Sequence, residues 1–153
     1  MSTLDRVGEL GNRFYDRIRR GDAMKAAEGE PGASGFDHLK GHTYCLVVSY
    51  KRDGSPVPTP VWFGLDDQGK LYFRSFTSAA KLRRLERDQR VLIAPCTMRG
   101  KPLGPSAPGS ARILGEHDEH AEAAIQSNYG LFRRTYESTA GAGEGRYVEV
   151  TPA

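Results

Sequence analysis

Three prolines at alternate positions, Pro56, Pro58 and Pro60, restrict the fold of this chain more than any other feature. Successive N–H groups of an extended strand point to opposite sides, so all three missing donors lie on one side of this segment. The other side can still donate from the residues between the prolines. The pattern predicts an edge strand whose outer side faces something other than a strand, such as a planar ring. Prolines that merely protect an edge from aggregation explain the pattern equally well.

The chain after residue 43 has the pattern of short antiparallel strands, because tight-turn sequences separate its apolar runs. We expect strands over 43–50, 57–65, 70–75, 90–95, 110–114 and 146–150. We expect a helix over 79–87 and one or two helical segments over 117–136, broken near residues 128–130. Ser78 is placed as the N-cap of the first of these helices. Many short strands with few helices favour a small closed or split β-barrel over alternating βαβ units.

The first part of the chain has a different character. Apolar residues recur at helical spacing over residues 3–27, and residues 28–35 have the Gly-rich composition of a linker. We therefore divide the chain into an N-terminal amphipathic helix with its linker, residues 1–35, and a barrel domain, residues 36–153.

Composition argues against two classes of partner. The formal net charge is +3, and acidic residues interrupt the basic ones along the chain. A nucleic-acid-binding domain more often has a pI above about 9 and a clustered basic face. No apolar run approaches the roughly 18 residues of a membrane span, and the charged start of the chain does not resemble a secretory signal. We expect a cytoplasmic protein without a nucleic-acid or membrane partner.

The two cysteines, Cys45 and Cys96, each lie inside an apolar run. Buried thiols behave as small hydrophobic side chains, and disulfides are rare in the cytoplasm. We expect free, buried cysteines and not a disulfide.

A second feature with chemical meaning lies between a predicted strand and a predicted helix. Ser75, Thr77 and Ser78 lead into a helix whose first turn contains Lys81. Free N–H groups at a helix N-terminus, with hydroxyl groups and a lysine beside them, bind phosphate. A lysine in the first turn opposes the helix dipole unless an anion compensates it. The segment predicts a phosphate site; the alternative is a surface helix with solvated basic side chains.

Several spaced blocks between residues 39 and 152 form a familiar set. They are Thr59-Pro60-Val61-Trp62-Phe63, Leu71-Tyr72-Phe73, Thr77-Ser78-Ala79-Ala80-Lys81, Arg90-Val91-Leu92-Ile93-Ala94-Pro95-Cys96, Arg99-Gly100 with Leu103-Gly104, and Tyr147-Val148-Glu149-Val150-Thr151-Pro152. As a set they resemble the pyridoxamine 5′-phosphate oxidase-like family. The resemblance is closest to its branch of deazaflavin-dependent oxidoreductases, which use coenzyme F420.

The resemblance implies a mainly β fold, a six-stranded antiparallel FMN-binding split barrel, that forms a homodimer with the cofactor in a groove at the dimer interface. The residues that it assigns to cofactor binding are Thr59, Pro60, Val61, Ser75, Thr77, Ser78, Lys81, Arg99 and Gly100. The first three would line the tricyclic ring, those from Ser75 to Lys81 would hold the phosphate, and the last two would approach the groove from a neighbouring hairpin. Trp62 would form either a wall of the groove or part of the core.

Two positions depart from the family pattern. Flavin-using pyridoxamine oxidases typically have basic residues just before the matched lysine, whereas this chain has Ala79 and Ala80. That difference favours coenzyme F420 over FMN. A lysine often precedes the Tyr-Gly of the C-terminal helix, whereas Asn128 precedes Tyr129 here, so one contact to the cofactor tail or substrate is missing.

Other polar residues suggest no further chemistry. His117 and His120 could share a helix face, but they lie in the acidic first turn of a predicted helix and no third ligand stands at a suitable spacing, so we expect no metal. No nucleophile motif is present. Tyr129 and Tyr136 are expected to be packing residues, and the catalytic residues are unassigned.

The leading functional hypothesis is hydride transfer from reduced coenzyme F420 to a small-molecule electron acceptor. In such enzymes the cofactor supplies the reactive chemistry and the protein supplies binding, orientation and electrostatics. An FMN-dependent oxidase or reductase of the same fold is one alternative. A cofactor-binding or haem-binding protein without turnover is another.

Overall fold

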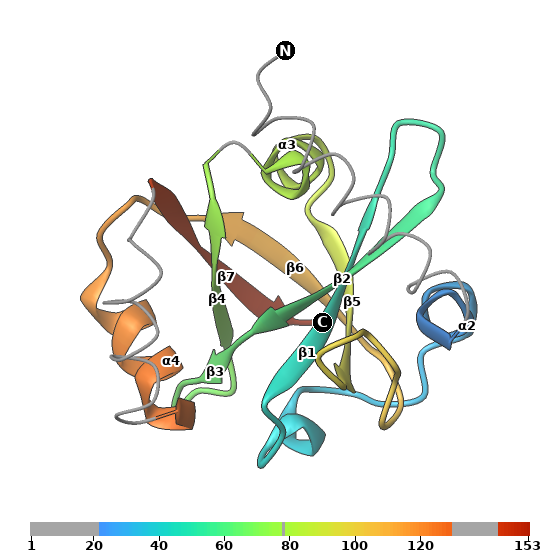
Figure 1. Cartoon of the computed structure of the whole chain (residues 1–153), viewed down its shortest axis with the longest axis horizontal. Helices are drawn as coiled ribbons and strands as arrows, with labels where there is room; N and C mark the ends of the chain where they lie inside the picture. Colours follow the sequence, from blue (N-terminus) through green and yellow to red (C-terminus); the bar gives the residue numbers. More distant parts are fainter. Residues whose placement is uncertain (1–21, 78, 130–143) are drawn as a thin grey trace.

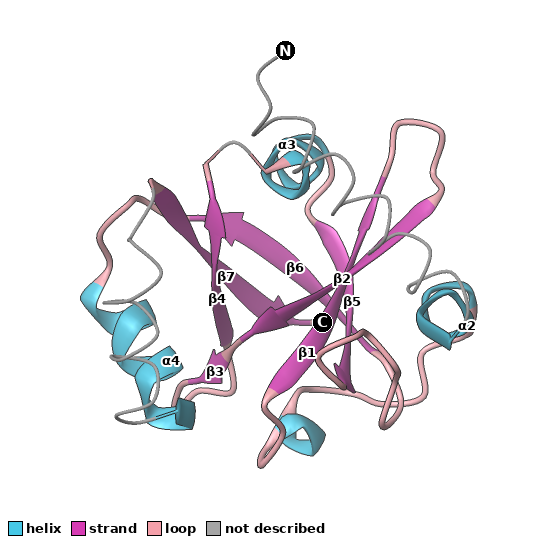
Figure 2. Cartoon of the chain, viewed as in Figure 1, coloured by secondary structure: helices cyan, strands magenta, loops and turns pink. Residues whose placement is uncertain are grey.

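The computed structural model describes residues 22–77, 79–129 and 144–153. Its elements in chain order are α2 (Asp22–Glu28), the 3-10 helix η1 (Asp37–Leu39), β1 (Tyr44–Tyr50), β2 (Pro56–Trp62), β3 (Gly64–Leu65), β4 (Leu71–Phe76), α3 (Ala80–Arg87), β5 (Arg90–Cys96), β6 (Ala107–Ile113), α4 (Glu119–Tyr129) and β7 (Gly145–Pro152). The seven strands form one antiparallel sheet in the order β2-β1-β5-β6-β7-β4-β3. The sheet curls into a half-barrel (Figures 1 and 2) and is consistent with the predicted split barrel.

The strand expected over residues 57–65 is divided at Phe63, which gives seven strands where six were predicted. β2 pairs with β1, whereas β3 pairs with β4. The division occurs because Phe63 bonds to side chains of α4: its N–H donates to Tyr129 Oη at 2.8 Å, and its C=O accepts from Asn128 Nδ2 at 3.0 Å. Since β2 and β3 lie at opposite ends of the strand order, this one segment joins the two ends of the sheet.

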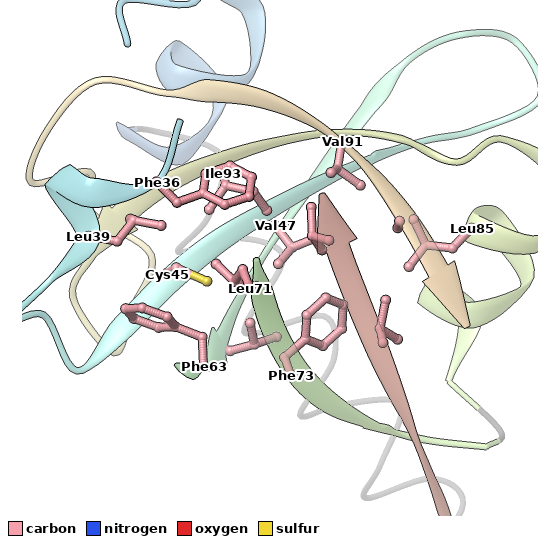
Figure 3. Close-up of a cluster of buried hydrophobic side chains, with 14 of the residues drawn as sticks. Phe36, Leu39, Cys45, Val47, Phe63, Leu71, Phe73, Leu85, Val91 and Ile93 are labelled. Carbon is pink, nitrogen blue, oxygen red and sulfur yellow. The ribbon is translucent and has the colours of Figure 1, made fainter. Parts of the chain in front are cut away.

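The largest apolar cluster lies where the curled sheet faces itself. Figure 3 shows side chains of β1, β4 and β5 meeting there, with Phe36 and Leu39 at one end and Leu85 of α3 at the other. Burying each large apolar side chain contributes about 1.5–3 kcal/mol. Cys45 lies in this cluster and Cys96 on the opposite face of the sheet, and both are free and buried, as predicted.

Two helices cover the outer faces of the sheet. Ala23 of α2 packs with Leu46 of β1, in a cluster that also holds part of β5. Ala121 and Ile125 of α4 pack with Tyr72 of β4, in a cluster that extends onto β7. The turn after β1 and the turn after β3 form as predicted, and Gly54 and Gly69 take the positive φ that each requires.

The ends of the helices differ from the sequence prediction in detail. α3 begins at Ala80, and Ala79, not Ser78, takes the N-cap position without a side-chain cap; Ser78 lies outside the described residues. The helical region expected over 117–136, with its break near residues 128–130, is described as α4 from Glu119 to Tyr129, and residues 130–136 also lie outside the description. β6 begins at Ala107, three residues before the predicted start at 110.

Of the helix predicted over residues 3–27, only the part within α2 is described, since residues 1–21 lie outside the description. The N–H groups of Gly32 and Ala33 in the predicted linker donate to the C=O of Ser106 at 3.1 and 3.0 Å. This part of the linker is therefore held against the barrel. The domain boundary after residue 35 stays a prediction. Within the described residues, no helix is both long and apolar enough to span a bilayer.

The Gly64→Ala substitution tests the close contact between α4 and the divided strand. A Cβ at Gly64 would lie 1.9 Å from the carbonyl oxygen of Ala124, so the helix must move away. We expect a loss of about 3 kcal/mol in the free energy of unfolding, measured with urea. In the control Gly115→Ala, the nearest atom to the new Cβ lies 3.9 Å away. Equal stability of the two variants would contradict this contact.

Candidate functional site

The proline-rich strand β2 is an edge strand, as the sequence predicts, and among the described strands it pairs with β1 alone. Pro56, Pro58 and Pro60 lie opposite residues 50, 48 and 46 of β1. Because prolines cannot donate, the paired N–H groups must come from the residues between them, and the proline nitrogens face away from β1. The outer side of β2 therefore has no regular donors toward a further strand.

Thr59, Pro60 and Val61 lie together in the middle of this edge. Thr59 pairs with Val47 and Val61 with Cys45, and Val61 is buried in the main core. Side chains alternate along a strand, so Pro60 faces the opposite side from its two neighbours. A ring placed here would meet the strand along its edge and not lie flat on three side chains.

Ser75, Thr77 and Lys81 lie where β4 leads into α3. Ser75 is buried near the end of β4, and Thr77 is exposed and donates its backbone N–H to the C=O of Glu144 at 3.1 Å. Lys81 is half-buried, with Nζ 5.6 Å from the centroid of the Phe73 ring, so its ammonium bends toward the end of the barrel. The structure thus brings together three of the four residues predicted to hold a phosphate; the fourth, Ser78, is not described.

The start of α3 is electropositive. Its first turn contains no acidic residue, and Ala79 provides no side-chain acceptor for the N–H groups there. Of the basic side chains farther along, Arg84 donates from Nε to Ser49 Oγ at 2.7 Å, and Arg87 donates to the C=O of Tyr50 at 3.0 Å. These two bonds fasten α3 to the end of β1. Free N–H groups and a lysine at a helix N-terminus suit an anion.

Arg99 and Gly100 do not join this group within one chain. They lie in a tight turn from Thr97 to Lys101 that connects β5 to β6, as predicted, and Gly100 has a φ of +89°. α3 precedes the first residue of β5 and the turn follows its last, so the two sites lie at opposite ends of that strand (Figure 1). The positions assigned to one cofactor are therefore divided between two regions of the chain.

Tyr129 packs as the sequence analysis expects, but the hydrogen bonds that Asn128 and Tyr129 make to the backbone were not predicted. Besides its bond to Phe63, Asn128 Nδ2 donates to the C=O of His42 at 3.1 Å, and Tyr129 Oη donates to the C=O of Thr43. The Tyr129 ring stacks on Trp62, with centroids 4.6 Å apart and planes inclined by 23°. Trp62 is thus packed against α4. In the sequence, the one sign of this role was that Asn128 stands where the family often has a lysine.

A family model described as pyridoxamine 5′-phosphate oxidase matches residues 36–153. The chain belongs to this family. Members of the pyridoxamine 5′-phosphate oxidase family bind flavin-type cofactors and include oxidoreductases. No curated protein matches the chain in sequence.

Solved structures support the fold of this pyridoxamine 5′-phosphate oxidase family member. HutZ, a haem storage protein from Vibrio cholerae, has a TM-score of 0.57 at 12% identity over 75% of this chain and 84% of its own. An F420 reductase has a TM-score of 0.54 at 16% identity over 79% and 94%. The conserved hypothetical protein Rv2991 from Mycobacterium tuberculosis has a TM-score of 0.55 at 18% identity over 76% of each chain. At these identities the likeness concerns the fold alone.

Two pockets of this family member are lined by residues other than the predicted cofactor residues. One, of about 400 Å³, lies between α2 and the β5–β6 connection, with Lys25 and Lys101 in its lining. The other, of about 380 Å³, lies beside η1, the β3–β4 turn and the end of α4, and its lining includes Asp37 and Asp67. Neither contains a residue predicted to bind the cofactor.

A polar cluster links α4 to the β3–β4 turn in this family member. Asp66 Oδ2 lies 2.9 Å from His120 Nε2 and 3.1 Å from Tyr72 Oη, which also donates to Glu149 Oε2 at 2.9 Å. Glu149 in turn bonds to Arg112 at 3.1 Å. Within the described ranges no group of three or more His, Cys, Asp or Glu could hold a metal ion. His120 is thus part of an ion pair that fastens the start of α4.

The His120–Asp66 pair predicts a pH-dependent contribution to stability. The hydrogen bond to Asp66 raises the pKa of His120 above its ordinary 6.5. Because the pKa of His120 is higher in the folded than in the unfolded state, protonated His120 contributes its full stabilisation below about pH 6.5. This contribution is lost as the pH rises through the folded-state pKa. The wild type should therefore exceed His120→Gln in free energy of unfolding at about pH 5.5, and by less at about pH 8.

Urea unfolding of both proteins across this pH range measures the difference. Glutamine retains a hydrogen-bond donor but no charge, so it isolates the effect of titration. In an Asp66→Asn background, His120→Gln should change the free energy of unfolding by the same amount at both pH values. Parallel pH profiles of the wild type and His120→Gln would show that the pair contributes nothing through its charge.

Proposed function

We propose that this chain is an oxidoreductase that transfers a hydride from reduced coenzyme F420 to a small organic acceptor, as a homodimer in a reducing cytoplasm. The observations that support it most directly are the start of α3, whose first turn has a lysine and no acidic residue, and the proline-rich edge strand β2. A phosphate-bearing cofactor with a planar ring needs both features. The two buried free thiols fit a reducing compartment.

The phosphate end of the cofactor suits the start of α3. Lys81 and Thr77 flank this helix start, and Lys81 is half-buried with its ammonium directed back toward the barrel. Ser75 adds a buried hydroxyl at the end of β4. A phosphate at this position would meet both the lysine and the positive end of the helix dipole. The small side chains of Ala79 and Ala80 leave the backbone approachable but add no charge, which favours the deazaflavin over FMN.

When bound, the reduced deazaflavin supplies the hydride, and the acceptor gains that hydride and one proton. The protein has to bind and orient the ring along Thr59, Pro60 and Val61 and exclude water from it. No catalytic acid or base is strictly required for the hydride step. Thr59, Arg99 or a water would donate a hydrogen bond to the charge that develops on the acceptor, and solvent would supply the proton. Quinones, nitroaromatics, tetrapyrroles and unsaturated ketones are all compatible acceptors.

A second copy of the chain would complete the site. Arg99 and Gly100 lie apart from Lys81 in one chain, so they can serve the same cofactor only from a partner. Exposed apolar side chains accompany both parts: Phe76 (62% exposed) beside Thr77, and Met98 and Leu103 (56% and 52%) around Arg99. Exposed apolar side chains near a functional site favour burial in an interface.

Fluorescence titration of the purified protein with oxidised coenzyme F420, and in parallel with FMN, tests the function. Micromolar binding of the deazaflavin with weak FMN binding is the expected result. Tight FMN binding alone would move the protein to the flavin-using oxidases or reductases. The haem storage neighbour makes haem a third ligand to include; haem binding without deazaflavin binding would reject the proposed reaction.

The Lys81→Ala variant tests the phosphate site. Loss of an ammonium paired with a phosphate should weaken deazaflavin binding by about 1–3 kcal/mol. Arg83→Ala is the matched control, because Arg83 is an exposed cation on the same helix. Fluorescence quenching measures both affinities. If Lys81→Ala binds as the wild type does, or if both variants lose the same affinity, the phosphate does not sit on Lys81.

A further inference from the structure

Two side chains of α4 take the place of the residue pair that would come next in the pairing of β1 with β2. β1 and β2 pair in regular register up to Tyr44 opposite Trp62. The next pair in this register would be Thr43 opposite Phe63. Because the prolines leave only the odd-numbered residues of β2 as donors, that pair would be a hydrogen-bonded one, with two direct backbone bonds. Neither bond forms, and the register ends there.

The Tyr129 hydroxyl and the Asn128 amide occupy the place of the missing Thr43–Phe63 pair. The hydroxyl accepts from the Phe63 N–H at 2.8 Å and donates to the C=O of Thr43. The amide uses its nitrogen to donate to the C=O of Phe63 at 3.0 Å and to the C=O of His42 at 3.1 Å. Without the Thr43–Phe63 pair, the N–H and the C=O of Phe63 would have no partner in a strand. The two side chains provide a partner for each of these groups.

This insertion sets the direction of the strand that precedes it. Beyond Phe63 the chain pairs with β4 through Gly64 and Leu65. The last residues of β2 and the first residues of β4 are therefore close to β3, and the two strands diverge with distance from β3 (Figure 1). Thr59 and Val61 lie only two to four residues before Phe63, on the segment whose direction the insertion determines. The far end of β4 leads to α3 and Lys81.

We propose that Asn128 and Tyr129 are positioning residues for the cofactor: they hold the β2–β4 divergence at the separation that lets one molecule reach both the Thr59–Val61 edge and Lys81. This inference rests on the proposed function for its ligand, but the strand geometry that it describes can be measured without one. Neither side chain touches the cofactor in this proposal. They act through the backbone of Phe63.

Tyr129→Phe is the primary variant, because it keeps the ring that stacks on Trp62 and removes only the hydroxyl. The Phe63 N–H and the Thr43 C=O then lose their bridge, and β2 is free to pair one residue further with β1. We expect coenzyme F420 to bind about tenfold more weakly, as the loss of one to two hydrogen bonds permits. We also expect faster amide exchange at Phe63 and Val61 in the unliganded protein, and a shifted absorption maximum of the bound deazaflavin.

Asn128→Asp is the second variant. It replaces an amide donor by a carboxylate that faces two carbonyl oxygens, so it should weaken binding more than Tyr129→Phe does. Tyr147→Phe is the matched control. Tyr147 Oη donates to Glu122 at 2.5 Å and so fastens α4 to β7. It should lower stability while leaving the affinity, the Phe63 exchange rate and the cofactor spectrum unchanged.

The outcomes separate this inference from the function on which it rests. If the wild type binds neither deazaflavin nor FMN, the proposed function fails, and the exchange rates at Phe63 and Val61 still decide whether the two side chains hold the strand. If the wild type binds and Tyr129→Phe matches it in affinity, spectrum and exchange, the positioning role is wrong. Equal losses of affinity in Tyr129→Phe and Tyr147→Phe would also overturn it, because they would reflect only a loosened helix.

Discussion

The change of strand partner at Phe63 is the constraint on which the rest of this fold depends. One segment provides both the first and the last strand of the sheet order, so the sheet curls only if the ladder to β1 stops and the ladder to β4 starts. Phe63 is buried, so its backbone groups need partners other than bulk water once the ladder to β1 stops. Asn128 and Tyr129 provide those partners, and Gly64 lets the backbone of α4 approach closely enough for them to reach.

The prolines of β2 complete what this change of partner begins. Once β3 has turned toward β4, β2 lies at one end of the strand order, where another β-edge could extend the sheet. Proline at alternate positions removes the donors on the outer side of β2 and keeps those that β1 needs. Protection of the edge and a place for a planar ligand are therefore not competing explanations, because a strand that no other strand can pair with is also one that a ring can approach.

Local chemistry predicted most of the fold but not its closure. Turns, edge strand and buried cysteines follow from residues that are close in sequence, and their predictions are confirmed. The division at Phe63 depends on a hydroxyl 66 residues away, which no periodicity reveals. β6 was predicted too short because Pro108 and Gly109 suggest a loop, yet Gly109 is needed where a Cβ would lie 2.9 Å from Val150. Packing here overrides propensity.

The candidate site shows the same division between local and distant information. The Ser75–Lys81 segment was recognisable because strand, hydroxyls and lysine follow one another, and the structure keeps them together. Arg99 and Gly100 were assigned by position alone, and one chain places them at the other end of β5. A cofactor that needs both groups has to lie between two copies, so its affinity would depend on the geometry of each barrel. That geometry includes the division at Phe63, so under the proposed function α4 would matter for binding as much as the residues that would touch the ligand.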